Sequence, residues 1–504
     1  MSQPQVHHDG ARLASLLAAG GARARAERRP VLVSLGERVP ELDPLLALES
    51  VMRASVSDER LAAHVAAGRM FWTRVRDGFT LLGLGAVATL APAGPDRFAS
   101  VDRAWHVLLD GALVSGAPDE ADGVGPVLMG GFAFEAGPRS ETWLGFPDAH
   151  LIVPRLQLAC RDGECWLTIS AIVSPDGEPD ATLEELAALR RVVLTVPVTQ
   201  SEPTASIDPR DTGLAFTSPI GASAWRAIVG SAVAAIRAGA LEKVVLAREV
   251  HATAAHEPDM LAMLRHLRAA HRDCFVFGYW RGERAFVGAS PERLARLDGR
   301  DVRASSLAGS ARRGATPTED AALASDLLAS AKDQAEHAAV RDALCDGLAE
   351  LCDDVTAAEA PSLLTLRHVH HLHTAVAATL RHGHSLLDVV ARLHPTPAVG
   401  GTPREAALEF IRRYEQLDRG WYAAPIGWVG RRSGEFAVAL RSAVISGSEA
   451  MLFAGCGIVA DSDPELEFAE SLLKLRPMQA ALVAALADAS SDAAKVTADA
   501  ELVL

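Results

Sequence analysis

Residues 243–253 read Lys-Val-Val-Leu-Ala-Arg-Glu-Val-His-Ala-Thr, a run rich in apolar and β-branched side chains that predicts a β-strand. Before it, the apolar spacing over 222–238 predicts a helix. After it, the pattern predicts a helix over 257–270 and strands over 274–280 and 285–297, with Gly, Arg and Asp in the turns. This mixture of helices and strands predicts an α+β fold.

The first half of the chain carries the same mixture but few residues suited to chemistry. Apolar runs predict strands over 79–90, 105–109 and 151–171, and helices are expected over 44–68 and 181–192. We find no internal repeat. A mixed, chemically quiet N-terminal part is therefore expected.

Three further segments describe how the chain is organised. The stretch 197–212 is rich in Pro, Ser, Thr and Asp, which predicts a long loop or a joint between domains. Residues 318–352 show the apolar spacing of one long helix. The residues after 486 are small and polar, which predicts a flexible tail at 486–504.

Composition restricts the class of protein. The 504 residues are 49% hydrophobic, enough for a large core, and the length alone would allow two to four domains. A net charge of -15 argues against nucleic-acid binding, which needs a basic surface. No run approaches the roughly 20 apolar residues of a membrane span, and the N-terminus lacks a secretory signal. We expect a cytoplasmic protein with no membrane contact, and the six cysteines, which show no metal-binding spacing, are expected to be reduced thiols.

The first group suited to chemistry lies at 462–474, Ser-Asp-Pro-Glu-Leu-Glu-Phe-Ala-Glu-Ser-Leu-Leu-Lys. The proline suits the start of a helix, and Glu467, Glu470 and Lys474 then fall at i, i+3 and i+7 on one face. Asp333 and Glu336 are likewise one turn apart in the expected helix over 318–352. One such acidic pair is usually a solvated surface, but two helices that each donate carboxylates could hold a magnesium ion against an anionic substrate.

Three other charged residues stand out. Lys243 opens an apolar strand, which is a costly place for an ammonium unless it is paired or neutral. Glu292 follows a strand at a proline, where an acid at a helix start is the simpler interpretation. In the expected strand 435–445, Arg441 shares a face with alanines, which leaves room either to grip a carboxylate or to extend into solvent.

Taken together, these segments resemble the chorismate-utilising enzymes related to anthranilate synthase component I, and among them the isochorismate synthases. The order and spacing of the shared motifs fit that family over roughly 220–480. The motifs are Leu-Glu-Lys-Val-Val-Leu-Ala-Arg (241–248), Ala-Ser-Pro-Glu-Arg-Leu (289–294), Leu-Ala-Gly-Ser (307–310), Lys-Asp-Gln-Ala-Glu-His (332–337), His-Pro-Thr-Pro-Ala-Val-Gly-Gly-Thr-Pro (394–403), Arg-Gly-Trp-Tyr-Ala-Ala-Pro-Ile-Gly (419–427), Ala-Gly-Cys-Gly-Ile (454–458) and Glu-x-x-Glu-x-x-x-Lys (467–474).

The resemblance implies one large α+β fold in which helices surround a β-rich core. Residues 1–205 would then be an N-terminal α+β part of the same body, and 215–485 would be the chorismate-binding catalytic region. The resemblance also implies a monomer that works without a glutamine amidotransferase subunit.

The resemblance assigns two residues to proton transfer and four carboxylates to metal binding. Lys243 would be the base that activates water at C2 of chorismate, and Glu292 the acid that protonates the departing C4 hydroxyl. Glu336 and Glu467 would bind Mg2+, with Asp333 and Glu470 as outer ligands. These roles require a raised pKa at Glu292 and a lowered one at Lys243.

The remaining assignments concern substrate binding. Tyr422, Arg441 and the backbone at Gly455 would hold the enolpyruvyl carboxylate, with Lys474 near the metal. Ser310 keeps the hydroxyl of the threonine usual at its position, and His371 would be a polar contact. The other histidines of 367–374 would face outward from the strand, so zinc is not expected there.

Which member of the family this is depends on two positions. Anthranilate-forming relatives carry Thr where this chain has Ala398 and lack the lysine at position 243. Salicylate-forming relatives keep that lysine but tend to carry Thr at position 398. The combination of Lys243 and Ala398 resembles isochorismate synthase, serving menaquinone or siderophore biosynthesis. A salicylate synthase is the alternative enzyme, and a non-catalytic chorismate-binding protein the alternative of another class.

Overall fold

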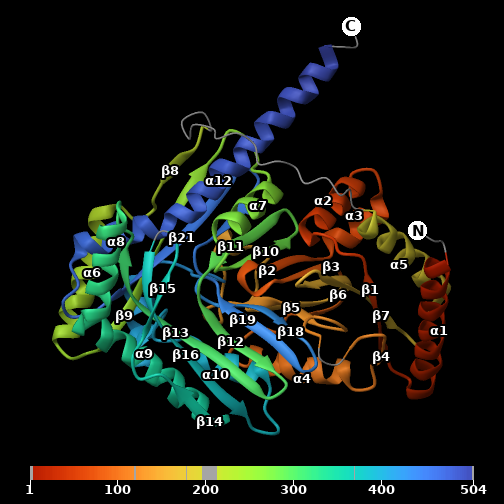
Figure 1. Ribbon diagram of the computed structural model, residues 1–504, viewed down its shortest axis with the longest axis horizontal. Coiled ribbons are helices and arrows are strands. Elements are labelled where there is room, and N and C mark those ends of the chain that lie inside the picture. The colour runs from red at the N-terminus through yellow and green to blue at the C-terminus, as the bar shows by residue number, and fades with distance from the viewer. Residues whose placement is uncertain (1–3, 119–120, 178, 196–212, 368, 502–504) are drawn as a thin grey trace.

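The computed structural model describes residues 4–118, 121–177, 179–195, 213–367 and 369–501 (Figure 1). The N-terminal elements occupy one end of the molecule, with α1 at its edge, and α6, α8 and α9 lie at the opposite end. Strands fill the space between them, and helix α12 crosses the strands and projects from the body at its C-terminal end. The α+β prediction is confirmed.

Helices cover the periphery of the strands. Those that the structure describes are α1 (Pro4–Glu27), α2 (Pro44–Ser55), α3 (Glu59–Ala66), α4 (Arg97–Leu109), α5 (Pro179–Leu194), α6 (Ala222–Arg237), α7 (Met260–Ala270), α8 (Pro317–Ala329), α9 (Ala331–Ala349), α10 (Leu386–Leu393), α11 (Arg404–Tyr414) and α12 (Pro464–Glu501), with short 3-10 helices η1 (Val75–Asp77) and η2 (Glu141–Trp143).

The described strands join through hydrogen-bonded pairings that are antiparallel except for β1 with β4. The N-terminal strands are β1 (Val31–Val39), β2 (Arg69–Arg74), β3 (Phe79–Leu90), β4 (Leu113–Ser115), β5 (Leu128–Phe132), β6 (Ala149–Arg161) and β7 (Glu164–Val173). The others are β8 (Ala215–Thr217), β9 (Lys243–Thr253), β10 (Phe275–Arg281), β11 (Arg284–Ser290), β12 (Arg293–Asp298), β13 (Asp301–Arg312), β14 (Cys352–Ala357), β15 (Ser362–Thr365), β16 (Val369–Leu380), β17 (Gly401–Thr402), β18 (Pro425–Val429), β19 (Ser433–Val438), β20 (Ser442–Ser446) and β21 (Glu449–Ile458).

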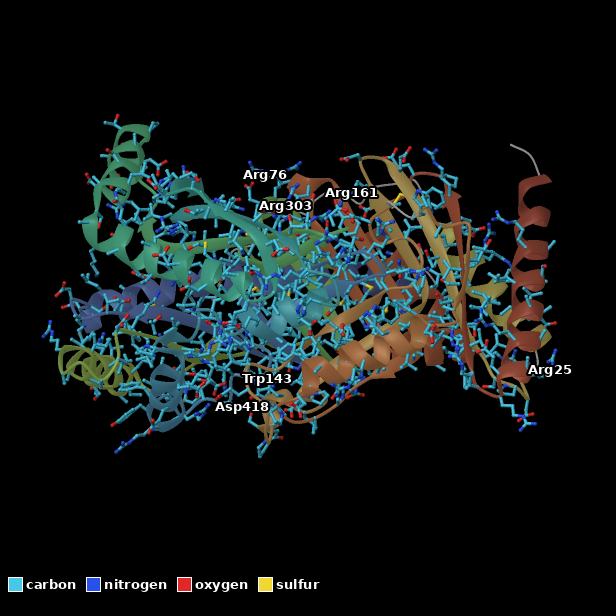
Figure 2. All side chains as sticks on the ribbon, turned by 90° about the horizontal axis from the view of Figure 1, so that it is seen from below. Arg25, Arg76, Trp143, Arg161, Arg303 and Asp418 are labelled. Carbon is cyan, nitrogen blue, oxygen red and sulfur yellow. A yellow bond between two sulfur atoms is a disulfide. The ribbon has the colours of Figure 1, made fainter. Side chains whose placement is uncertain are left out.

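The two halves of the chain share strands and core. Strand β2 pairs with β10, and β5 pairs with β18. Buried aromatic rings meet across the same boundary: Trp143 stacks on Phe453 at 5.2 Å between centroids, and its indole nitrogen donates to the Asp418 carbonyl at 2.9 Å (Figure 2). Burying one large apolar side chain contributes roughly 1.5–3 kcal/mol. The core therefore stabilises both halves together.

Several expected elements are confirmed and several are divided. The strand over 79–90 is present with those bounds, and 222–238 forms α6. The expected strand 105–109 is wrong, because it lies inside α4, where Phe98, Val101 and Trp105 recur at helical spacing on the buried face. The expected helix 44–68 is two helices, since Asp58 caps the start of α3.

The long helix expected over 318–352 also divides. Ser330 ends α8 and caps α9, its side chain accepting from the backbone N–H of Asp333 at 3.2 Å. The sequence 151–171 forms the hairpin of β6 and β7 rather than one strand. The loop expected over 197–212 lies wholly outside the described residues, and helix α12 continues through the expected tail to Glu501.

The expectation of six reduced cysteines is wrong for two of them. Cys160 and Cys165 face each other across the hairpin of β6 and β7, with Cα atoms 4.2 Å apart, and form a disulfide. Their separation of five residues gave no sign of this in the sequence, because the pairing depends on where the hairpin turns. The other four cysteines are free. Among the described residues no helix is long and apolar enough to span a membrane.

Candidate active site

A cavity of about 350 Å3 lies between β9, β13, β21, α9 and α12. Every residue to which the sequence assigned a role in the site lines it, although these residues are spread over more than 230 positions of the chain. They are Lys243, Glu292, Ser310, Asp333, Glu336, His371, Ala398, Tyr422, Arg441, Gly455, Glu467, Glu470 and Lys474. The fold thus brings the whole predicted set to one place.

Lys243 enters the cavity from the first position of β9. Its ammonium lies 2.7 Å from a carboxylate oxygen of Glu336 on α9. Gly457 of the neighbouring strand β21 makes room for this pair, since a Cβ there would lie 2.9 Å from the Lys243 Cε atom. Burial opposes ionisation of Glu336, but Lys243 outweighs it and lowers the pKa of that carboxyl. The proposed role of Lys243 as a base stays a prediction.

Glu292 and Arg441 reach the cavity at two strand breaks that face each other. The expected strand 285–297 ends at Ser290 and resumes as β12, and the expected strand 435–445 breaks after Val438 and resumes as β20. The predicted alternation around Arg441 is therefore wrong: its backbone is left-handed, with φ 48°. The two breaks are joined by hydrogen bonds from Val438 N–H to the Glu292 carbonyl, 3.1 Å, and from Ala289 N–H to the Arg441 carbonyl, 3.1 Å.

Glu292 is buried, with 4% of its surface exposed. Burial raises its pKa to about 8, although the ammonium groups of Lys243 and Lys474 partly oppose the shift. At neutral pH this carboxyl therefore carries a proton that it can donate. The sequence-based expectation of a raised pKa agrees with this environment.

A hydrogen-bonded chain links Ser310, His371 and Arg441. Gly309, with φ 76°, forms a bulge in β13 that turns Ser310 toward β16, where its Oγ lies 2.8 Å from His371 Nδ1. An NH2 group of Arg441 lies 3.0 Å from His371 Nε2. Because a guanidinium only donates, Nε2 must accept, so Nδ1 carries the proton and donates to Ser310. Burial, followed by Arg441 and Lys474, lowers the pKa of His371, which keeps the ring neutral.

Helix α12 presents Glu467, Glu470 and Lys474 to the cavity, as the spacing predicted. Lys474 lies 2.8 Å from Glu470 and donates to the Gly455 carbonyl at 2.9 Å. Glu467 accepts from Ser462 at 2.7 Å. Burial, with the nearby Glu470 as the second cause, raises the pKa of Glu467 to about 7.

These carboxylates fit a divalent cation. Oxygens of Glu467 and Glu470 lie within 4.8 Å of each other and of the Cys456 sulfur, and Asp333 and Glu336 face the same cavity from α9. Burial is the main cause of the raised Glu467 pKa, and the repulsion from Glu470 that adds to it is what a bound cation would relieve. Burial raises the pKa of the Cys456 thiol well above its usual value, so oxygen ligands dominate and a hard divalent cation suits the site.

A buried ion pair, of which Arg419 lines the cavity, was not expected from the sequence. Glu415, which caps the C-terminal end of α11, and Arg419 in the segment that follows lie 2.5 Å apart. Arg419 also donates to the carbonyls of Val245 and Val399, at 2.7 and 2.8 Å. Glu415 accepts from the Ala247 N–H at 2.8 Å. The pair ties β9 to the turn that carries Ala398, and its i, i+4 spacing is the one signal the sequence offered.

One histidine departs from its expected place. His370 was expected on an outer face, but it is buried and contacts Asp320 of α8 at 2.9 Å and Thr365 at 3.0 Å. It does point away from His371, as neighbours in a strand must. His368 lies outside the described residues.

Comparison with known proteins agrees with this geometry. The profile of a family described as "Chorismate binding enzyme" matches residues 18–483. This chain belongs to the chorismate-binding enzyme family.

Two relatives of the family resemble the chain over nearly its whole length. A "Salicylate biosynthesis isochorismate synthase" of Pseudomonas aeruginosa is 37% identical, with 92% of each chain covered. "Isochorismate synthase MenF" of Bacillus subtilis is 34% identical, covering 91% of this chain and 95% of that one. The solved structure of the menaquinone-specific isochorismate synthase MenF of Escherichia coli is 26% identical with a TM-score of 0.71, covering 94% of this chain and 99% of that one. The predicted family and fold are confirmed.

Proposed function

We propose that this protein is an isochorismate synthase, which converts chorismate reversibly into isochorismate in the presence of Mg2+. The observation that carries the proposal is one cavity in which Lys243 and a protonated Glu292 share space with four carboxylates and Arg441. The named relatives, all isochorismate synthases, support it.

Substrate recognition follows from the charges. Chorismate carries two carboxylates, and a protein of net charge -15 must concentrate cations where it binds them. Arg441, with Tyr422 and the backbone at Gly455, would hold the enolpyruvyl carboxylate. Glu336 and Glu467 would hold Mg2+, with Asp333 and Glu470 as outer partners. The bound cation supplies positive charge that neutralises the ring carboxylate.

Two residues of the chain perform the proton transfers. Lys243 accepts a proton from the water that attacks C2, as the ring double bonds shift. Glu292 donates its proton to the C4 hydroxyl, which leaves as water, so one water enters and one departs. The poor leaving group explains why Glu292 must be protonated at neutral pH.

Lys243 must be neutral before it can act as the base. In the described arrangement it is paired with Glu336 at 2.7 Å. If Glu336 held the cation, Lys243 would lose part of this counter-charge, which would favour its action as a base. The proposal therefore couples metal binding to activation of the base.

The test is to incubate purified protein with chorismate, with and without Mg2+, and to separate the products by chromatography while measuring pyruvate. We expect a Mg2+-dependent product of the same mass as chorismate and no pyruvate. Salicylate with pyruvate would instead establish the alternative enzyme. Absence of turnover despite chorismate binding would overturn both and favour a binding protein.

A further inference from the structure

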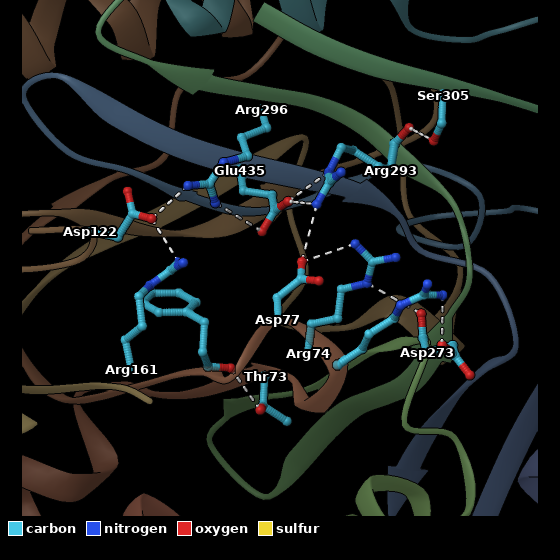
Figure 3. Close-up of polar contacts among 12 residues, drawn as sticks. Thr73, Arg74, Asp77, Asp122, Arg161, Asp273, Arg293, Arg296, Ser305 and Glu435 are labelled. Carbon is cyan, nitrogen blue, oxygen red and sulfur yellow. Dashed lines mark hydrogen bonds and ion pairs between the residues drawn. The ribbon is translucent and has the colours of Figure 1, made fainter. Parts of the chain in front are cut away.

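We infer that Arg293, clamped by Glu435 and Asp77, is a positioning residue that holds Glu292 in place for proton donation. The inference rests on the proposed function of Glu292. Arg293 follows Glu292 directly, but it does not line the cavity. Its side chain belongs to a separate network of ion pairs with Glu435 and Asp77 (Figure 3).

The network grips the guanidinium from two sides. Arg293 Nε and NH2 lie 2.7 and 2.6 Å from one carboxylate oxygen of Glu435, which is 2% exposed. The same NH2 lies 3.3 Å from Asp77 of the N-terminal half. The guanidinium carbon also lies 5.5 Å from the Phe275 ring centroid. A planar guanidinium held this way has little freedom to rotate.

The backbone between clamp and cavity is held as well. The Glu292 N–H donates to Ser290 Oγ at 3.2 Å, and the Glu292 carbonyl accepts from the Val438 N–H at 3.1 Å. The Arg293 carbonyl accepts from Ser305 Oγ at 3.3 Å. With these bonds in place, the clamp on Arg293 fixes the direction in which the preceding side chain, Glu292, must point.

A strand irregularity explains why the clamp is needed. Between Arg293 and Ala295 the register of β12 against β19 shifts, so that Arg293 faces Ala437 while Ala295 faces Phe436. Bulges of this kind re-aim a side chain at the cost of local pairing. Glu292 lies directly before β12, next to this bulge, and the Arg293 ion pairs hold the first residue of the strand in place.

The test compares kcat and KM for chorismate in Arg293→Ala, Arg293→Lys and a matched control, Arg296→Ala. Arg296 lies in the same network, 2.6 Å from Asp122 and 3.9 Å from Glu435, but three residues further from Glu292. A displacement of about 1 Å at a reacting group can cost roughly 100-fold in rate. We expect Arg293→Ala to lower kcat about 100-fold with KM changed less than threefold, Arg293→Lys to recover about tenfold of that, and Arg296→Ala to keep kcat within about twofold.

Equal losses of kcat in Arg293→Ala and Arg296→Ala, or no loss in Arg293→Ala, would overturn the inference. If Arg293→Ala does not fold, Arg293→Lys and Asp77→Asn carry the same comparison. A wild-type protein that does not turn over chorismate would instead overturn the proposed function.

A second readout needs no turnover. Glu292 faces the ammonium groups of Lys243 on β9 and Lys474 on α12, and it has little contact with solvent. Loosening the clamp admits water to Glu292. The increase, from pH 5 to pH 8, in the stability gained on Glu292→Gln should therefore be at most half as large in the Arg293→Ala background as in the wild-type background. An unchanged gain would show that Arg293 does not position Glu292.

Discussion

Replacing Glu292 by Gln should stabilise the protein while it removes the activity. The pKa of Glu292 rises from 4.5 to about 8, mainly through burial. Between these values the folded protein keeps a proton that the unfolded chain has lost, so burial of this carboxyl costs stability, and the cost grows with pH. The cost is absent well below pH 4.5 and complete above pH 8.

The size of the effect follows from the same two values. The linkage relation gives a cost of about 1 kcal/mol at pH 5, about 3 kcal/mol at pH 7 and about 4 kcal/mol at pH 8. Glu292→Gln, which has a similar shape and no charge, removes this cost. The variant should therefore gain little stability at pH 5 and several kcal/mol at pH 8, with kcat lowered roughly 100- to 10,000-fold because the proton donor is lost.

Urea denaturation of both proteins at pH 5, 7 and 8 measures the effect. The matched control is Glu449→Gln, at an exposed position on β21, which should change stability little and equally at each pH. A Glu292→Gln gain that is the same at pH 5 and pH 8 would refute the account of the buried carboxyl. Near-native turnover of the variant would refute its role as the acid.

Three further outcomes follow from the site. Glu467→Gln should weaken Mg2+ binding at least tenfold by calorimetry. Glu465→Gln, at an exposed position two residues earlier where the carboxylate pairs with Arg226, should leave Mg2+ binding unchanged, and equal affinities of the two variants would remove Glu467 from the metal site. Arg441→Lys should raise KM for chorismate more than it lowers kcat, because an ammonium cannot grip a carboxylate with two bonds, and an unchanged KM would contradict that role. Glu415→Gln, which leaves the Arg419 charge buried without its partner, should cost about 3–5 kcal/mol in urea denaturation, and a loss below 1 kcal/mol would contradict the account of that pair.

Local pattern was enough to predict most of the elements that hold the site. The strand opened by Lys243 and the helix face with Glu467, Glu470 and Lys474 appear where period and capping placed them. The strand and the helix face each depend on the spacing of residues close in sequence, which can be seen directly in the sequence.

The features that shape the cavity could not be predicted in this way. The strand breaks that bring Glu292 and Arg441 to the cavity lie opposite each other, and backbone hydrogen bonds join them. This arrangement is long-range, and Pro291 is its only local sign in the sequence. The Arg293 clamp joins residues as far apart as Asp77 and Glu435. The Cys160–Cys165 disulfide depends on hairpin register, which apolar spacing alone does not determine.

The most direct test of the proposed chemistry is to run the reaction in water enriched in oxygen-18 and to analyse the product by mass spectrometry at low conversion. Attack of solvent water at C2, with loss of the C4 hydroxyl, predicts isochorismate that carries one heavy oxygen, placed at C2 by fragmentation. Isochorismate without the label would mean that the hydroxyl moves within the substrate, and the assignment of Lys243 as the base that activates water would be wrong.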